Sequence, residues 1–144
     1  MLLVHALLPL VLALLPQPRP EVAAASVLHD WDSRRAAAWA AGDARGLRSL
    51  YVPGSEAGRA DVRMLSEWRR AGRRVDDLEM QLRCVAVRRA APARLDLVVV
   101  DRVVTSRDRP STWRLVLVRS GGAWRMAQVS AVRTTSCTVR SRKS

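Results

Sequence analysis

Isoleucine, asparagine and phenylalanine are absent from the 144-residue chain, and its only lysine is Lys143. The codons of these residues are rich in A and T, so their scarcity indicates a gene of high G+C content. The formal net charge of +12 is carried almost entirely by arginine. Because such a gene favours arginine codons regardless of function, the charge is weak evidence for an anionic partner.

The sequence also lacks the features of a nucleic-acid-binding protein. Its basic residues are spread over the whole chain, and no helix-turn-helix, RNP or zinc-finger spacing is visible. We therefore expect no nucleic-acid partner. Outside the cytoplasm, a basic chain would instead meet anionic lipid headgroups or wall polymers, and the basic tail from Arg133 to Lys143 would be its docking segment.

Cysteine and histidine are scarce. Two of each, at unrelated spacings, argue against a zinc site, and we expect neither a metal nor a cofactor. A disulfide between Cys84 and Cys137 would stabilise the fold in an oxidising compartment. The first cysteine falls on the apolar face of an expected strand and the second in a polar tail, so the sequence leaves their pairing open.

No apolar run is long enough to span a membrane. Leu2 to Leu15 is nearly all Leu, Val and Ala, but a spanning helix needs about 20 such residues. Prolines in residues 16–20 cannot continue a helix, and Ala23 to Ala25 offers the small residues that a signal peptidase accepts. We expect residues 1–25 to be a signal peptide, cleaved after Ala25, or a short membrane anchor, since no basic residue precedes the run. A buried core helix is the alternative.

Helical periodicity comes first in the remaining chain and strand periodicity afterwards, which predicts a segregated α+β domain. Helices are expected over 26–41, over 44–51 with Asp43 as the N-cap, and over 60–71 with Met64, Leu65 and Trp68 inward. Strands are expected over 78–86, 95–105, 112–119 and 123–132. The first should hold Leu78, Met80, Leu82, Cys84 and Ala86 on one face. Ser120-Gly121-Gly122 is a hairpin signal.

The residues of this domain resemble a known superfamily. The opening Val27-Leu28-His29-Asp30-Trp31-Asp32, the segment Ala36 to Asp43, Leu47 to Tyr51, and the closing Gly121-Gly122-Ala123-Trp124-Arg125 look like the NTF2-like superfamily, especially its SnoaL-like branch. The Tyr51-Val52-Pro53-Gly54-Ser55, Met80-Gln81-Leu82, Asp101-Arg102 and Arg109-Pro110-Ser111-Thr112 patterns resemble uncharacterised exported actinobacterial proteins. The resemblance implies a cone of three N-terminal helices packed on a curved antiparallel sheet over residues 26–132, often dimeric. It implies no single activity, because the superfamily includes enzymes and non-catalytic binding domains.

Two charged residues fall on faces expected to be apolar. Arg35 lies in the middle of the first helix's apolar stripe, and Asp101 shares a strand face with leucines and valines. An inward charge is costly unless it is paired, so we expect the two to meet, either as a structural ion pair or around a ligand. A β-bulge would instead turn Asp101 outward.

Few other residues are candidates for chemistry. His29 flanks the stripe of the first helix, where an exposed histidine is the ordinary outcome. Ser55 lacks the spacing of a nucleophile elbow. The five tryptophans are expected in the core, with one or two of their indole N–H groups bordering a pocket.

Two functions follow. The first is an extracytoplasmic, secreted or anchored, non-catalytic domain that binds a small molecule or an envelope protein through Trp31, Arg35, Trp39, Tyr51 and Asp101. The alternative is a SnoaL-like enzyme that performs proton transfer or hydration, with Asp101 as base and Arg35 as electrostatic stabiliser.

Overall fold

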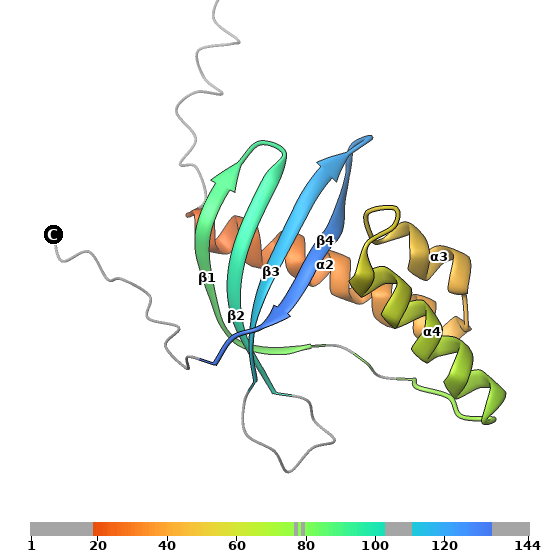
Figure 1. The fold of residues 1–144 in the computed structure, drawn as a ribbon. Helices are drawn as coiled ribbons and strands as arrows, with labels where there is room; N and C mark the ends of the chain where they lie inside the picture. The colour runs from red at the N-terminus through yellow and green to blue at the C-terminus, as the bar shows by residue number, and fades with distance from the viewer. Residues whose placement is uncertain (1–18, 77, 79, 103–110, 134–144) are drawn as a thin grey trace, which may run out of the picture.

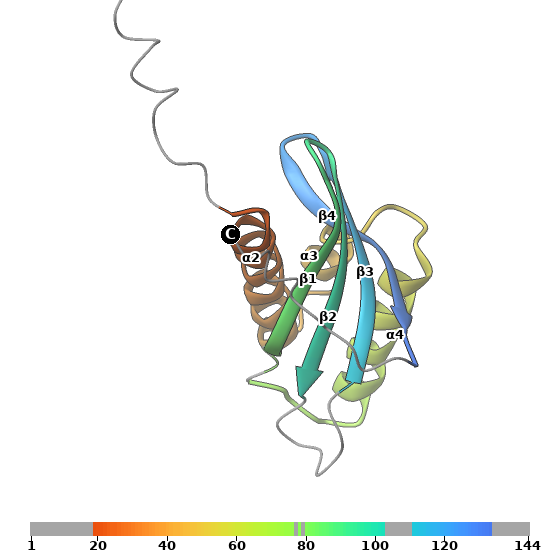
Figure 2. The ribbon, with the colours of Figure 1, turned by 90° about the vertical axis from the view of Figure 1, so that its left-hand side faces the viewer.

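The computed structural model describes residues 19–76, 78, 80–102 and 111–133. Within these residues, three helices precede four strands: α2 (Pro20–Ala41), α3 (Ala44–Ser49), α4 (Glu56–Arg70), β1 (Gln81–Ala91), β2 (Arg94–Arg102), β3 (Ser111–Ser120) and β4 (Ala123–Ala131). The strands form one antiparallel sheet in the order β1-β2-β3-β4. Helix α2 lies across one face of the sheet, and α4 contacts β4 (Figure 1 and Figure 2). The expected α+β architecture is confirmed.

Helix α2 begins at Pro20 rather than at the expected Ser26. A proline interrupts the interior of a helix. It is tolerated in the first turn, because the N–H that it lacks would have no partner within the helix there. Ala24 is 1% exposed and belongs to the core, so the predicted cleavage point after Ala25 lies inside a packed helix. The apolar run over 2–15 lies outside the described residues. None of the described helices is long and apolar enough to cross a membrane.

Polar side chains start the next two helices. Asp43 caps α3 as predicted and accepts a 2.8 Å hydrogen bond from the Gly46 N–H. Ser55 caps α4 by accepting one of 3.2 Å from the Gly58 N–H, so this helix starts at Glu56 and not at Ala60.

The buried face of α4 differs in part from the predicted one. Leu65 is 2% exposed and Trp68 packs against the core, as expected. Met64 is 48% exposed, so its inward prediction was wrong. The buried residues Gly58, Asp61 and Leu65 define the inner face, and Met64 points about 100° away from Leu65 around the helix axis.

Strand β1 contains a bulge that the alternation of apolar residues in the sequence does not reveal. Leu82 pairs with Asp101, but Cys84 pairs with Val100, so one extra residue is inserted between them. Cys84 therefore points to the opposite face from Leu82. The prediction of a single apolar face over 78–86 was wrong, and the strand itself begins only at Gln81.

Two tight turns complete the meander. Gly121 and Gly122 have φ angles of 58° and 80°, which is the left-handed conformation that a two-residue turn between twisted strands requires. The predicted hairpin is confirmed. The turn between β1 and β2 takes only residues 92–93, so both strands reach further than expected. The charged loop over 107–110 lies outside the described residues.

Alternation gives the sheet two faces. The helix-facing side buries Leu95, Leu97, Val99, Leu115, Leu117 and Met126 against α2 and α3. We call the opposite side the outer face; it carries Cys84, Val98, Val100, Thr112, Arg114, Val116 and Val118. Figure 1 looks onto the outer face, with α2 behind the strands.

Candidate functional site

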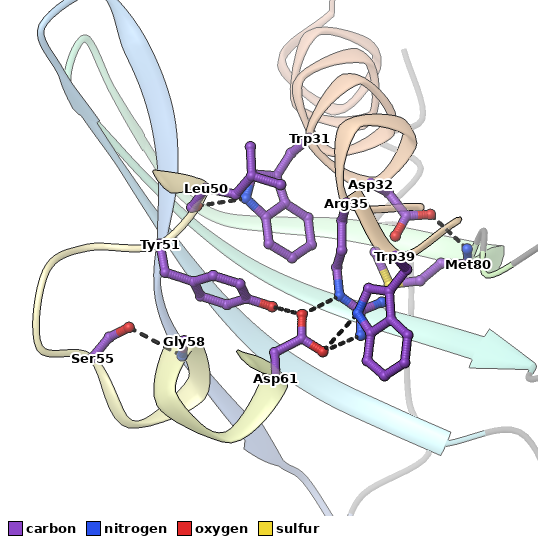
Figure 3. Close-up of polar contacts among 10 residues, drawn as sticks. All are labelled: Trp31, Asp32, Arg35, Trp39, Leu50, Tyr51, Ser55, Gly58, Asp61 and Met80. Atoms are coloured by element: carbon purple, nitrogen blue, oxygen red, sulfur yellow. Dashed lines mark hydrogen bonds and ion pairs between the residues drawn. The ribbon is translucent and has the colours of Figure 1, made fainter. Parts of the chain in front are cut away.

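A buried carboxylate, Asp61, is the centre of a polar cluster between the helices (Figure 3). Its two oxygens accept hydrogen bonds from Arg35 Nε at 2.7 Å, Arg35 Nη2 at 2.8 Å, Trp39 Nε1 at 3.2 Å and Tyr51 Oη at 2.7 Å. Asp61 is only 6% exposed, and the Arg35 side chain is 20% exposed. We call these four residues the Asp61 cluster.

The helices bring the cluster together by simple geometry. Arg35 and Trp39 lie one turn apart on α2, so both point the same way. Tyr51 follows α3 and is fixed by an isolated bridge to Met126 of β4. Gly58 makes room for the phenol ring, since a Cβ at this position would lie 2.7 Å from that of Tyr51.

Burial and charge act in opposite directions on the Arg35 guanidinium. Burial lowers its pKa, but the hydrogen bonds and the negative charge of Asp61 outweigh burial and raise the pKa above its ordinary value. Burial, followed by the charge of Asp61, also raises the pKa of the Tyr51 phenol above its ordinary value. The cluster therefore holds a permanent cation, a carboxylate and a phenol that keeps its proton.

The structure gives Arg35 a different partner from the predicted one. The bidentate ion pair is made with Asp61 and not with Asp101. A sequence signal for Asp61 existed: it precedes Leu65 by four residues and Trp68 by seven, which places it on the inner stripe of the same helix.

Asp101 is buried as predicted. It is 6% exposed and lies on the helix-facing side of β2, opposite Leu82 on β1 and Ser111 on β3. The bulge that could have turned it outward occurs in β1 and leaves β2 regular on that side.

The other predicted binding residues use their polar groups within the chain. The Trp31 indole N–H donates to the Leu50 carbonyl at 2.8 Å, and its ring meets that of Tyr51 edge to face at 5.4 Å. Trp31, Trp39 and Tyr51 are each at most 5% exposed. They form the wall between helix and sheet, and whether they also touch a ligand stays a prediction.

Three further polar residues, His29, Ser55 and Asp32, lie outside the Asp61 cluster. His29 is exposed on α2, as expected. Ser55 is a helix cap. Asp32, which sequence reasoning passed over, is 3% exposed and accepts a hydrogen bond from the Met80 N–H, joining α2 to the segment before β1. In the described part of the chain no three His, Cys, Asp or Glu side chains are placed to hold a metal ion.

A pocket of about 390 Å³ lies behind the Asp61 cluster, at the C-terminal ends of α2 and α4. One wall is aromatic: Trp39 and Trp68 meet edge to face, with ring centroids 6.2 Å apart. The rim is basic. The lining residues are Trp39, Ala40, Ala41, Gly42, Leu65, Trp68, Arg69, Gly72, Arg73, Arg74 and Val75. We call this the arginine pocket.

No acidic residue lines the arginine pocket. Arg69 donates to the Gly42 carbonyl at 2.8 Å, and the Arg73 guanidinium lies 5.3 Å from the centre of the Trp68 ring. Among the described residues, none of the three lining arginines forms an ion pair with a carboxylate. The pocket is therefore a positive site with one apolar wall.

Among solved structures, the chain is similar to a designed NTF2 protein, Rd1NTF2_05. The TM-score is 0.52 at 15% identity, over 78% of this chain and 99% of that one. The fold is NTF2-like. A Mycobacterium tuberculosis protein of unknown function, Rv3472, gives a TM-score of 0.47 at 11% identity, over 79% of this chain and 75% of that one.

No family model and no curated protein matches the chain. At these low identities the NTF2-like similarity shows the fold alone, and the same fold carries many functions. Function must therefore be argued from the two polar features described above, the Asp61 cluster and the arginine pocket.

Proposed function

We propose that this NTF2-like domain is a non-catalytic binding domain for a small anionic ligand with a flat apolar part, and that the arginine pocket is its site. The observation that carries the proposal is the lining itself: three arginines that form no ion pair with a carboxylate of the described residues, beside two indole rings. Guanidinium groups bind carboxylates and phosphates through charge-assisted hydrogen bonds, and indoles stack on flat rings.

The Asp61 cluster supports a binding domain over an enzyme. The SnoaL-like alternative needs Arg35 as an electrostatic stabiliser, but Asp61 already neutralises Arg35 through a bidentate pair. A guanidinium that is paired and hydrogen-bonded in this way has little charge left to offer a reaction intermediate. The cluster instead joins three parts of the chain: α2, α4 and the segment that follows α3. Trp39 belongs both to this cluster and to the lining of the arginine pocket.

We also propose that the domain works outside the cytoplasm, secreted or held at the membrane by its N-terminal segment. The apolar run over 2–15 supports this location. A second support is Cys84, which is disulfide-bonded, since structural disulfides persist in oxidising compartments. Cell fractionation of an epitope-tagged chain tests it: recovery in the cytoplasm, with unprocessed mass, would contradict export.

A pair of matched probes tests the ligand chemistry. Indole-3-acetate carries the carboxylate and the flat ring, whereas indole-3-acetamide has the same shape without the charge. We expect isothermal titration to show saturable binding of the acid and at least about tenfold weaker binding of the amide, because a charge-assisted hydrogen bond contributes about 1.5–3 kcal/mol.

Matched variants locate the site. The double substitution Arg73→Gln and Arg74→Gln should lower the affinity for the acid about tenfold or more. The control is Arg45→Gln with Arg48→Gln, which removes the same charge from the exposed surface of α3 and should leave the affinity unchanged. Equal losses of affinity in both double variants would show that only the overall charge matters and would contradict the proposed site. An unchanged affinity in both would mean that the acid binds elsewhere on the protein.

A further inference from the structure

The end of α4 fixes the backbone of Arg73 beside Trp68. The Gly72 N–H donates to the Arg69 carbonyl at 3.0 Å, and the Arg73 N–H donates to the Trp68 carbonyl at 2.9 Å. With Gly72 at a φ angle of 68°, these two hydrogen bonds form a Schellman motif. Such a motif brings the residue after the glycine close to the fifth residue before it, so the backbone itself directs Arg73 towards Trp68.

The other two arginines of the arginine pocket are held differently. Arg69 donates through Nη1 to the Gly42 carbonyl at 2.8 Å, and a Cβ at Gly42 would lie only 2.9 Å from the Arg69 Nε. This guanidinium joins the ends of α2 and α4, and part of its donor edge is already used. Arg74 is exposed and forms no hydrogen bond, ion pair or ring contact with another described residue, so no described residue fixes its side chain.

Arg73 is held by an aromatic ring. The central carbon of its guanidinium lies 5.3 Å from the centre of the Trp68 ring, within the range of a cation–π contact. This contact is made with the π electrons of the indole and uses no hydrogen-bond acceptor, so the five N–H donors of the guanidinium stay available. Arg73 therefore combines a defined position with unused donors, which neither Arg69 nor Arg74 does.

The same contact limits what the indole rings can offer a ligand directly. A flat ligand cannot stack on the face of Trp68 that Arg73 covers while Arg73 stays there. Trp39 meets the Trp68 ring at an angle of 83° and is only 4% exposed, so it presents little surface. The apolar part of a ligand is then left to other residues of the lining, such as Ala41 and Val75.

We propose that Arg73 is the residue of the arginine pocket that selects an anionic group, and that Trp68 is a positioning residue that holds the Arg73 guanidinium ready for it. The inference rests on the proposed function and assigns one arginine to the anion. The group that fits is an oxyanion such as a carboxylate, because two of its oxygens can accept the paired N–H groups of one guanidinium. Trp68 thus contributes to affinity without stacking on the ligand.

A measurement on the full chain without ligand tests the contact. Protons above an indole ring resonate upfield in an NMR spectrum, so the side-chain signals of Arg73 should lie upfield of those of Arg74, its exposed neighbour. In Trp68→Phe this shift should decrease, because tryptophan is the strongest cation–π partner. Equal positions for the two arginines in the wild type would overturn the proposal.

Isothermal titration with indole-3-acetate tests the roles. Arg73→Gln should lower the affinity about tenfold or more. Arg74→Gln removes the same charge one residue away and should lower it less than about threefold. Trp68→Leu should lower it about fivefold, which corresponds to a cation–π contact of about 1 kcal/mol, and Trp68→Phe should recover part of that loss.

The combination of Trp68→Leu with Arg73→Gln separates positioning from direct contact. If Trp68 acts through Arg73, the double variant should bind the acid no more weakly than Arg73→Gln alone. A further loss of about fivefold in the double variant would make Trp68 a direct contact of the ligand and overturn its positioning role. Should Trp68→Leu fail to fold, Trp68→Phe, which keeps an aromatic ring in the core, replaces it in the same comparison.

A failure of the proposed function gives a different result from a failure of this inference. A wild type that does not bind indole-3-acetate would overturn the proposed function, and the role of Arg73 with it, even if the Arg73 signals are shifted. A wild type that binds the acid, with equal losses in Arg73→Gln and Arg74→Gln, would leave the proposed function standing and overturn the assignment of the anion to Arg73.

Discussion

At the scale of single residues, we expect the stability of this protein to depend strongly on the hydrogen bonds and the ion pair of one buried carboxylate, Asp61. Asp61 accepts hydrogen bonds from three side chains and neutralises Arg35 in a mostly buried setting. Removing one member of such a pair leaves an uncompensated charge, which costs more than the pair contributes. The Asp61 cluster is thus expected to be much more sensitive to substitution than any surface ion pair.

Replacing Asp61 with Asn tests this. The amide keeps the shape but loses the charge, so we expect the free energy of unfolding to fall by about 3 kcal/mol. The matched control is Asp30→Asn, which breaks the exposed pair between Asp30 and Arg34, whose side chains are 70% and 43% exposed. That change should cost less than about 1 kcal/mol. Urea denaturation measures both, and similar losses would show that the buried pair has no special weight.

The single tyrosine of the chain reports on the same cluster. Burial and the charge of Asp61 raise the pKa of Tyr51, so the folded protein keeps its phenol proton at pH values where the unfolded chain, with a pKa of about 10, has lost it. The stabilisation is complete below about pH 10 and is lost as the pH rises further, because the unfolded state then binds fewer protons.

The ultraviolet absorbance of the phenolate follows this titration without interference from other tyrosines. We expect a midpoint above that of the denatured chain, together with a fall in stability above about pH 10 that Tyr51→Phe does not show. Identical midpoints in folded and denatured protein would place the Tyr51 hydroxyl in water and not against Asp61.

Single residues also show what the sequence could and could not reveal. Arg35 was recognisable as a charge inside an apolar stripe, because helical spacing fixes which residues share a face. Helical spacing also places Asp61 on an inner stripe, but it does not show which carboxylate meets Arg35. Several carboxylates were available, and only the packing of α4 against α2 places Asp61 opposite Arg35.

At the scale of elements, α4 can pack closely against Tyr51 because Gly58 has no side chain. A Cβ on Gly58 would lie 2.7 Å from the Tyr51 Cβ, which is too close for either residue to remain in place. Alanine inside a helix normally stabilises it by up to about 1 kcal/mol relative to glycine. Here the clash should dominate.

We therefore expect Gly58→Ala to destabilise the protein by about 1–3 kcal/mol, the usual cost of overpacking. Arg63→Ala, at an exposed position of the same helix, is the control and should stay within about 0.5 kcal/mol of the wild type. Thermal unfolding of both variants decides the matter. A stabilised Gly58→Ala would mean that Tyr51 is not held against α4.

The elements themselves were largely predictable and their irregularities were not. Periods of 3.6 and 2 residues identify the helices and strands, because apolar residues repeat on the buried face of each. Two local exceptions broke the pattern. Pro20 starts α2 inside the segment expected to precede the domain, and the bulge at Leu82 and Cys84 exchanges the two faces of β1. Both depend on backbone hydrogen bonding, which side-chain periodicity does not record.

At the scale of the whole molecule, the order of helices before strands was enough to predict the α+β class, whereas the NTF2-like fold was expected from the resemblance of particular residues to that superfamily. The function could not be predicted from the fold, because proteins of one fold carry different side chains at their sites and have different functions. The arginine pocket was not predicted, since its residues come from the ends of α2 and α4 and from the segment after α4. Only the folded chain shows that these ends meet.

The central claim is that an anionic ligand binds in the arginine pocket and not in the interior behind the sheet. The five tryptophans provide a direct test, because each indole N–H gives its own signal in a nitrogen-15 NMR spectrum. On titration with indole-3-acetate, we expect the signals of Trp39 and Trp68, which line the pocket, to shift, and those of Trp113 and Trp124 on the sheet to stay in place. A spectrum in which Trp31 shifts while Trp68 does not would move the site to the interior and contradict this account.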